Sequence, residues 1–156
     1  MVKSEITPDL DATLDILAAE CAGLQDQWWV FGSAAMALAG VPNLFPPDVD
    51  LIVSERDARH LVTAWNADVE TGAGSPIFRS QIFAKAQVAP LPIEIIAGFE
   101  AQQDGAWSAV RPATRLAIER LGGTVFIPAV AEQAQICRRF GRPKDLARLA
   151  ALEALI

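Results

Sequence analysis

The segment from Trp28 to Ser54, WWVFGSAAMALAGVPNLFPPDVDLIVS, constrains the fold more than any other part of this 156-residue chain. An apolar run ends in Gly32-Ser33 and opens an Ala-rich stretch, which predicts a strand, a tight turn and a helix. Backbone N–H groups and a hydroxyl would then lie at a helix N-terminus, where phosphate groups bind. Asp48-x-Asp50 stands directly before a second apolar run, so both carboxylates would share one strand face, about 7 Å apart. The segment predicts a phosphate site beside a divalent-metal site.

Composition limits the class of protein. Hydrophobic residues make up 52% of the chain and charged residues 21%, which is typical of a single globular domain, expected over residues 1–156. Within it we expect a core at about 27–128 and C-terminal helices at about 129–156. No apolar run approaches the length of a membrane span, and the N-terminus does not resemble a signal peptide, so a soluble, cytoplasmic protein is expected. The formal net charge of −6 argues against a broad nucleic-acid-binding surface.

The N-terminal half alternates between helix and strand signals. Thr7-Pro8 predicts a helix start, with Thr7 as N-cap and Pro at the first helical position. Strands are expected at Trp28–Phe31 and Asp48–Val53. Between them lie a small-residue helix ending at Gly40 and a proline-rich loop, and Ser54 would cap a third helix.

The stretch from Ile77 to Val88 alternates apolar and polar residues and predicts one strand. If Ala89-Pro90 forms a two-residue hairpin with the following run, Lys85 pairs with Glu94 across the strands. Arg79 and Lys85 would then lie on the face that carries Glu94.

The C-terminal half is harder to assign. Residues 98–109 are expected to be irregular, and residues 115–121 fit either a helix or, more consistently with Gly122-Gly123, the first strand of a second hairpin. Pro128 and Pro143 each introduce a helix, and these two helices would form a terminal pair against the sheet. The whole chain therefore predicts an α/β (α+β) fold, a mixed sheet flanked by helices.

The order of these motifs resembles the nucleotidyltransferase superfamily, which has the polymerase-beta-like fold. The matching residues are Gly32-Ser33, Asp48-x-Asp50 and Glu94 within PIEII. The tail from Gly141, GRPKDLARLAALEAL, further resembles that of small bacterial nucleotidyltransferase-like proteins, some of them parts of toxin–antitoxin modules. The third carboxylate is Glu, where the family more commonly has Asp.

The resemblance implies transfer of a nucleoside monophosphate from a nucleoside triphosphate, expected to be ATP, to an acceptor hydroxyl. Asp48, Asp50 and Glu94 would bind Mg²⁺ or Mn²⁺ and form the catalytic centre. Four further residues would contact phosphate or acceptor groups: Gly32, Ser33, Arg79 and Lys85. The acceptor could be a small molecule, an RNA end or a protein hydroxyl.

Other interpretations of the same residues stay open. Ser33 could be only a helix cap, Glu94 could form an ion pair with Lys85, and Arg79 with Lys85 could be a solvated strand face. Phosphatases of the haloacid-dehalogenase type and glycosyltransferases place their aspartates after an apolar strand, whereas here the strand follows the pair. Lys144 and its neighbours are expected to begin a helix, with nucleotide or partner contact as the alternative. The alternative function is a non-catalytic nucleotide-binding or antitoxin-like subunit whose partner is encoded by a neighbouring gene.

Overall fold

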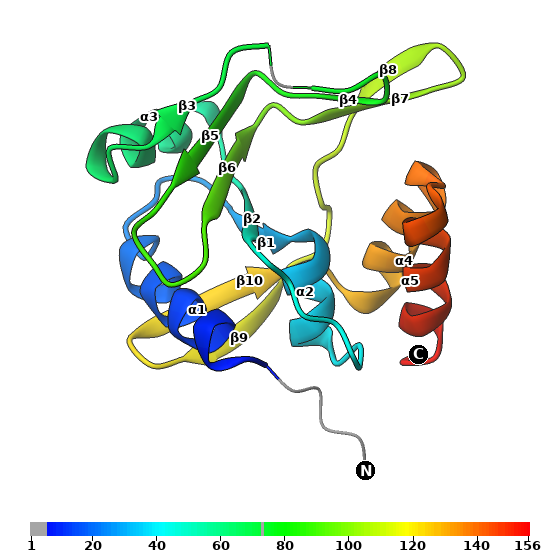
Figure 1. Cartoon of the computed structure of the whole chain (residues 1–156), viewed down its shortest axis with the longest axis horizontal. Helices are drawn as coiled ribbons and strands as arrows, with labels where there is room; N and C mark the ends of the chain where they lie inside the picture. The colour runs from blue at the N-terminus through cyan, green and yellow to red at the C-terminus, as the bar shows by residue number, and fades with distance from the viewer. Residues whose placement is uncertain (1–5, 73) are drawn as a thin grey trace.

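The strand that carries Asp50 lies inside a mixed five-stranded sheet (Figure 1). The computed structural model describes residues 6–72 and 74–156. Its helices are α1 (Pro8–Glu20), α2 (Gly32–Ala39), α3 (Glu55–Ala64), α4 (Val130–Phe140) and α5 (Pro143–Glu153). Its strands are β1 (Trp29–Phe31), β2 (Val49–Ile52), β3 (Asp68–Val69), β4 (Phe78–Arg79), β5 (Ile82–Ala86), β6 (Ile93–Ala97), β7 (Glu100–Gln103), β8 (Ala106–Ala109), β9 (Leu116–Arg120) and β10 (Gly123–Ile127).

The main sheet has the strand order β1-β2-β6-β5-β3. Strands β2 and β6 run parallel and place Asp50 beside Glu94, whereas the other neighbours are antiparallel. A three-stranded sheet, β4-β7-β8, and the hairpin β9-β10 complete the strands of the described chain. This confirms the predicted mixed α+β architecture.

Alternation along the strands divides the main sheet into two unlike faces. One face is wholly apolar and packs against α1, α2 and α3 through residues such as Val30, Leu51 and Ile95. The opposite face carries Asp50 and Glu94 next to a second cluster that includes Phe31 and Ile96. Because helices fill the first face, a ligand must approach from the second.

Helix ends follow the sequence signals closely. The Thr7 hydroxyl accepts a hydrogen bond from the Leu10 N–H at 3.2 Å, and the Ser54 hydroxyl does the same for the Asp57 N–H. Gly40 ends α2 at φ 109°, a left-handed conformation that glycine adopts without strain. The predicted starts of α1 and α3 and the predicted end of α2 are therefore confirmed.

The terminal helices α4 and α5 form the expected pair, at the right of Figure 1. One side of α4 packs with Met36 of α2 and Leu152 of α5, and its Phe140 joins the apolar cluster on the open face of the main sheet. The pair therefore borders the face that carries the carboxylates.

Three strand predictions are wrong. The stretch Ile77–Val88 is not one strand: it breaks at Ser80-Gln81 into β4 and β5, which belong to different sheets. Residues 98–109 are not irregular but form the β7-β8 hairpin, whose turn is Asp104-Gly105, both at positive φ. The β5-β6 connection spans residues 87–92 rather than two residues, although the predicted pairing of Lys85 with Glu94 is correct.

Helices in the described part of the chain are too short, or too polar, to cross a lipid bilayer.

Candidate active site

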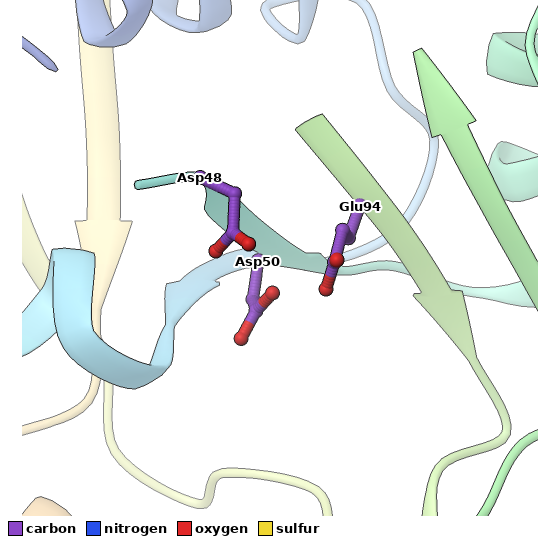
Figure 2. Close-up of side chains that lie close together, drawn as sticks. All are labelled: Asp48, Asp50 and Glu94. Carbon is purple, nitrogen blue, oxygen red and sulfur yellow. The ribbon is translucent and has the colours of Figure 1, made fainter. Parts of the chain in front are cut away.

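Three carboxylates converge on the open face of the main sheet (Figure 2). Asp48 lies one residue before β2, Asp50 lies within it, and Glu94 stands directly beside Asp50 on β6. One oxygen of each carboxylate lies within 4.8 Å of the other two. All three side chains are partly buried, so the group is held by the sheet and is not a loose surface cluster.

The electrostatics of this group favour a cation. Burial, followed by the nearby Glu94 and Asp48 carboxylates, raises the pKa of Asp50. Burial and Glu94 likewise raise the pKa of Asp48, while Lys85 and Lys144 oppose that shift. The Oδ1 atom of Asp50 is buried and has no hydrogen-bond partner among the described residues. An unpaired buried carboxylate oxygen costs free energy, and a divalent cation with oxygen ligands would remove that cost.

Gly32 brings a helix N-terminus against this carboxylate group. It is the first residue of α2 and has φ +64°, where residues with a side chain are strained. A Cβ atom at this position would lie 2.8 Å from Asp50 Oδ2. Glycine therefore lets the free N–H groups at the start of α2, with Ser33 beside them, approach the carboxylates closely. A phosphate on the N–H groups could then lie next to a cation on the carboxylates.

Lys85 lies opposite Glu94, but its ion pair is with a different residue. Its Nζ atom is 3.5 Å from Oε1 of Glu70, which follows β3. The alternative in which Lys85 neutralises Glu94 is therefore contradicted. Glu94 instead faces Asp50, as the metal-site prediction requires.

Arg79 does not share the sheet face of Glu94, because the strand break at Ser80-Gln81 places it on β4. Its Nε donates to Glu100 Oε1 at 2.9 Å, and its guanidinium lies 4.2 Å from the ring centroid of Trp107. Arg79 still lines the same cleft as the carboxylates, so it remains a candidate for ligand contact at the rim.

The carboxylates line a cleft of about 620 Å³, within the range usual for small-molecule sites. All seven residues predicted for the site line this cleft. These are Gly32, Ser33, Asp48, Asp50, Arg79, Lys85 and Glu94. The fold therefore brings together the residues that the motifs and the family resemblance selected, although Arg79 reaches the cleft from β4 and not from the strand face of Glu94.

Lys144 is a cleft residue that the sequence prediction did not place in the site. It lies in the first turn of α5 and forms no ion pair within the described residues, and its charge opposes the rise in the pKa of both Asp48 and Asp50. A signal was available, because a cation in the first turn of a helix is unfavourable with the helix dipole. The first turn of α5, which carries Lys144, is held by a contact between Asp145 and Arg142. Asp145 is 2% exposed and accepts hydrogen bonds from the Arg142 side chain at 2.6 and 3.0 Å.

One part of the cleft lining is apolar. Phe78, Phe99 and Phe140 meet there edge to face or tilted, with centroids 4.8–6.2 Å apart, and Arg142 lies 4.8 Å from the Phe78 ring centroid. Nearby on α4, the Gln133 side chain donates to the Pro128 carbonyl at 2.8 Å, which leaves its buried Oε1 without a partner in the described structure. No pattern in the sequence brings these residues together, because they come from β4, α4 and connecting segments, some of them far apart in the chain.

Solved structures of similar shape are nucleotidyltransferases or nucleotidyltransferase-like proteins. A proposed nucleotidyltransferase of Thermotoga maritima superposes with a TM-score of 0.71 at 19% identity, covering 88% of each chain. An antigenic nucleotidyltransferase-like protein of Paracoccidioides brasiliensis gives a TM-score of 0.58 at 19% identity, covering 96% of this chain and 77% of that one. The lincosamide adenylyltransferase LnuA, solved with lincomycin bound, gives 0.56 at 12% identity, covering 92% and 94%.

No protein-family model matches the sequence, and no curated protein does. The structural similarity therefore rests on shape, with low sequence identity throughout. On that ground, the chain has the nucleotidyltransferase fold.

Proposed function

We propose that this protein transfers a nucleoside monophosphate from a nucleoside triphosphate to an acceptor hydroxyl, with the help of a divalent cation. One observation carries the proposal. Asp48, Asp50 and Glu94 converge beside the N-terminus of α2, at Gly32, on the open face of the sheet. Transfer of a nucleotidyl group requires carboxylates for cations and N–H donors for phosphate in one place.

The roles of the residues follow from their positions. Asp48, Asp50 and Glu94 would hold Mg²⁺ or Mn²⁺, which neutralises phosphate charge and lowers the pKa of the attacking hydroxyl when bound. The α2 N-terminus would bind the terminal phosphates through backbone N–H groups and the Ser33 hydroxyl. Lys144, which lines the same cleft, would supply positive charge for the phosphates.

The acceptor is proposed to be a small molecule that bears a hydroxyl group. Part of the cleft lining is apolar, including Phe78 and Phe140, which suits a compact ligand with an apolar part. LnuA, which has the same fold, is an adenylyltransferase solved with the antibiotic lincomycin. RNA ends and protein hydroxyls are tested as alternative acceptors.

The test is label transfer from nucleoside triphosphates. Purified protein is incubated with Mg²⁺ and ATP, GTP, CTP or UTP labelled at the α-phosphate, together with small hydroxyl compounds, an RNA oligonucleotide or a protein extract. We expect the α-label to move to an acceptor with release of unlabelled pyrophosphate. A γ-labelled nucleotide should leave its label in the pyrophosphate.

Matched variants separate catalysis from folding. Asp50→Asn and Asp48→Asn should lower label transfer about 100-fold or more, since each removes a carboxylate from the cation site. Asp104→Asn, at an exposed turn of the β7-β8 hairpin, makes the same chemical change away from the cleft and should leave transfer unchanged. Equal transfer by wild type and Asp50→Asn would contradict the proposal.

The position of Glu94 argues against the non-catalytic alternative. Glu94 stands where the family more commonly has Asp, yet it lies beside Asp50, which supports a role as metal ligand. Toxin–antitoxin membership and the cytoplasmic location stay predictions. Co-purification with the product of a neighbouring gene, unaffected by Asp50→Asn, would favour the interaction subunit.

A further inference from the structure

A lysine stands next to the carboxylate group without neutralising it. Lys85 and Glu94 are directly opposite on the antiparallel strands β5 and β6, where side chains on one face are about 5 Å apart at Cβ. A cross-strand Lys–Glu ion pair would be the ordinary outcome. Instead, the Lys85 ammonium lies 3.5 Å from Glu70 Oε1.

Glu70 is held in place by the backbone of the edge strand. Strand β3 pairs with β5 so that Asp68 lies opposite Lys85 and Val69 opposite Ala84. The pairing continues by one residue, since the Glu70 N–H donates to the Phe83 carbonyl at 2.8 Å. The backbone of Glu70 is therefore fixed at the cleft wall, and the side chain extends from there to Lys85.

This contact matters for the charge of the cation site. An ammonium beside Glu94 would repel a divalent cation bound by the same carboxylate, because like charges this close together are only partly screened in a partly buried site. We propose that Glu70 is a positioning residue: by binding Lys85, it keeps the ammonium off Glu94 and so preserves the affinity of the three carboxylates for a divalent cation. The inference rests on the proposed function, because it assumes that the carboxylates bind a cation.

The ion pair between Lys85 and Glu70 contributes little to the stability of the fold. The side chains of Lys85 and Glu70 are 43% and 41% exposed, and ion pairs this open to solvent contribute little to folding stability. Loss of Glu70 should therefore change cation affinity while thermal stability stays almost the same.

The test is a double-mutant cycle read by cation binding alone. Titration calorimetry measures Mg²⁺ and Mn²⁺ binding, without nucleotide, to wild type, Glu70→Gln, Lys85→Met and the double variant. We expect Glu70→Gln to weaken binding about three- to tenfold, because the freed ammonium moves toward Glu94. In the Lys85→Met background the same substitution should have no effect on affinity.

The cycle excludes a direct electrostatic effect of Glu70. If Glu70→Gln acted only by removing one negative charge near the cleft, the loss would persist when Lys85 is absent, and the inference would be wrong. Equal affinities of wild type and Glu70→Gln would also overturn it.

Glu100→Gln is the matched control. It removes an equally charged partner from Arg79, which remains stacked on Trp107 and away from the carboxylates, so cation affinity should not change. If wild type itself binds neither cation, the proposed function fails, and this result is distinct from failure of the inference.

Discussion

Gly32 shows how one residue without a side chain determines the site. Gly32 has a φ of +64°, which strains residues with a side chain. A Cβ atom at this position would also lie only 2.8 Å from Asp50 Oδ2, so both the backbone conformation and the space favour glycine. The sequence predicted its role as a phosphate-binding turn. It did not predict the steric contact with Asp50, because that contact depends on the pairing of β1 with β2.

Gly32→Ala is expected to disrupt the cation site more than the fold. The new methyl group would push the Asp50 carboxylate away, so Mg²⁺ affinity should fall about tenfold or more, with a loss of about 1–2 kcal/mol in the free energy of unfolding. Calorimetric titration and chemical denaturation measure the two effects.

Gly72→Ala is the control for backbone strain in this comparison. Gly72 also has positive φ, +74°, but a Cβ atom there would meet no atom within 4 Å. It should cost similar stability and leave Mg²⁺ affinity unchanged. If both variants bind Mg²⁺ as wild type does, Gly32 has no steric role at the site.

Among the elements, α5 was predicted correctly as a helix, but its contribution to the cleft was not. Its start at Pro143 follows from local sequence signals. That Lys144 in its first turn faces Asp48 and Asp50 depends on how the terminal pair packs beside α2, and no local pattern encodes that packing.

Lys144→Met should separate nucleotide binding from cation binding. Removal of the ammonium leaves more negative potential at the carboxylates, so affinity for Mn²⁺ alone should stay equal or rise. Affinity for nucleoside triphosphate should fall about tenfold, because a charge-assisted phosphate contact is lost. Fluorescence titration with a labelled ATP analogue, beside Mn²⁺ calorimetry, measures both.

Arg138→Met is the matched control for Lys144→Met. Arg138 lies on α4 and pairs with Glu153 of α5 at 3.0 Å, with 60% of its side chain exposed. Neither affinity should change. A parallel loss of both affinities in Lys144→Met would instead indicate that the start of α5 had unfolded.

Hairpins show where sequence signals were sufficient and where they were missed. The β9-β10 pairing was favoured by Gly122-Gly123 and is confirmed. The β7-β8 hairpin was missed although Asp104-Gly105 is a strong turn signal, because the flanking residues, apart from Trp107, are polar or small and lack apolar alternation. The break in Ile77–Val88 had a sequence signal that the prediction of one strand passed over, because three successive polar residues, Arg79-Ser80-Gln81, interrupt the alternation there.

On the scale of the whole molecule, alternation predicted which strand face carries the carboxylates. It could not predict how that face becomes a cleft. The walls come from α4, α5 and β4, which are distant in sequence and meet through aromatic contacts such as Phe78 with Phe140. Long-range packing of this kind leaves no periodic trace in the chain.

The carboxylates that would bind the cation also destabilise the metal-free protein when they are ionised. Burial and neighbouring charge raise the pKa of Asp50 from 3.8 to about 8, so the folded state holds this proton more tightly than the unfolded state does. Its contribution to stability is therefore complete below the unfolded pKa and is lost as pH rises through the folded pKa. A bound divalent cation favours the ionised carboxylates and opposes this loss.

We therefore expect the metal-free protein to lose stability, by up to about 5 kcal/mol, as pH rises from about 4 to about 8. Saturating Mg²⁺ should flatten this part of the curve, because the cation replaces the proton between the carboxylates. Asp50→Asn should also flatten it and, with a chelator present, be more stable than wild type at pH 8, since it removes a buried charge. Thermal melts across this pH range, with chelator or Mg²⁺, measure all three effects. If stability depends on pH in Asp50→Asn as it does in wild type, the dependence arises elsewhere. If stability does not change with pH in this variant, the carboxylates proposed to catalyse transfer also limit the stability of the metal-free fold.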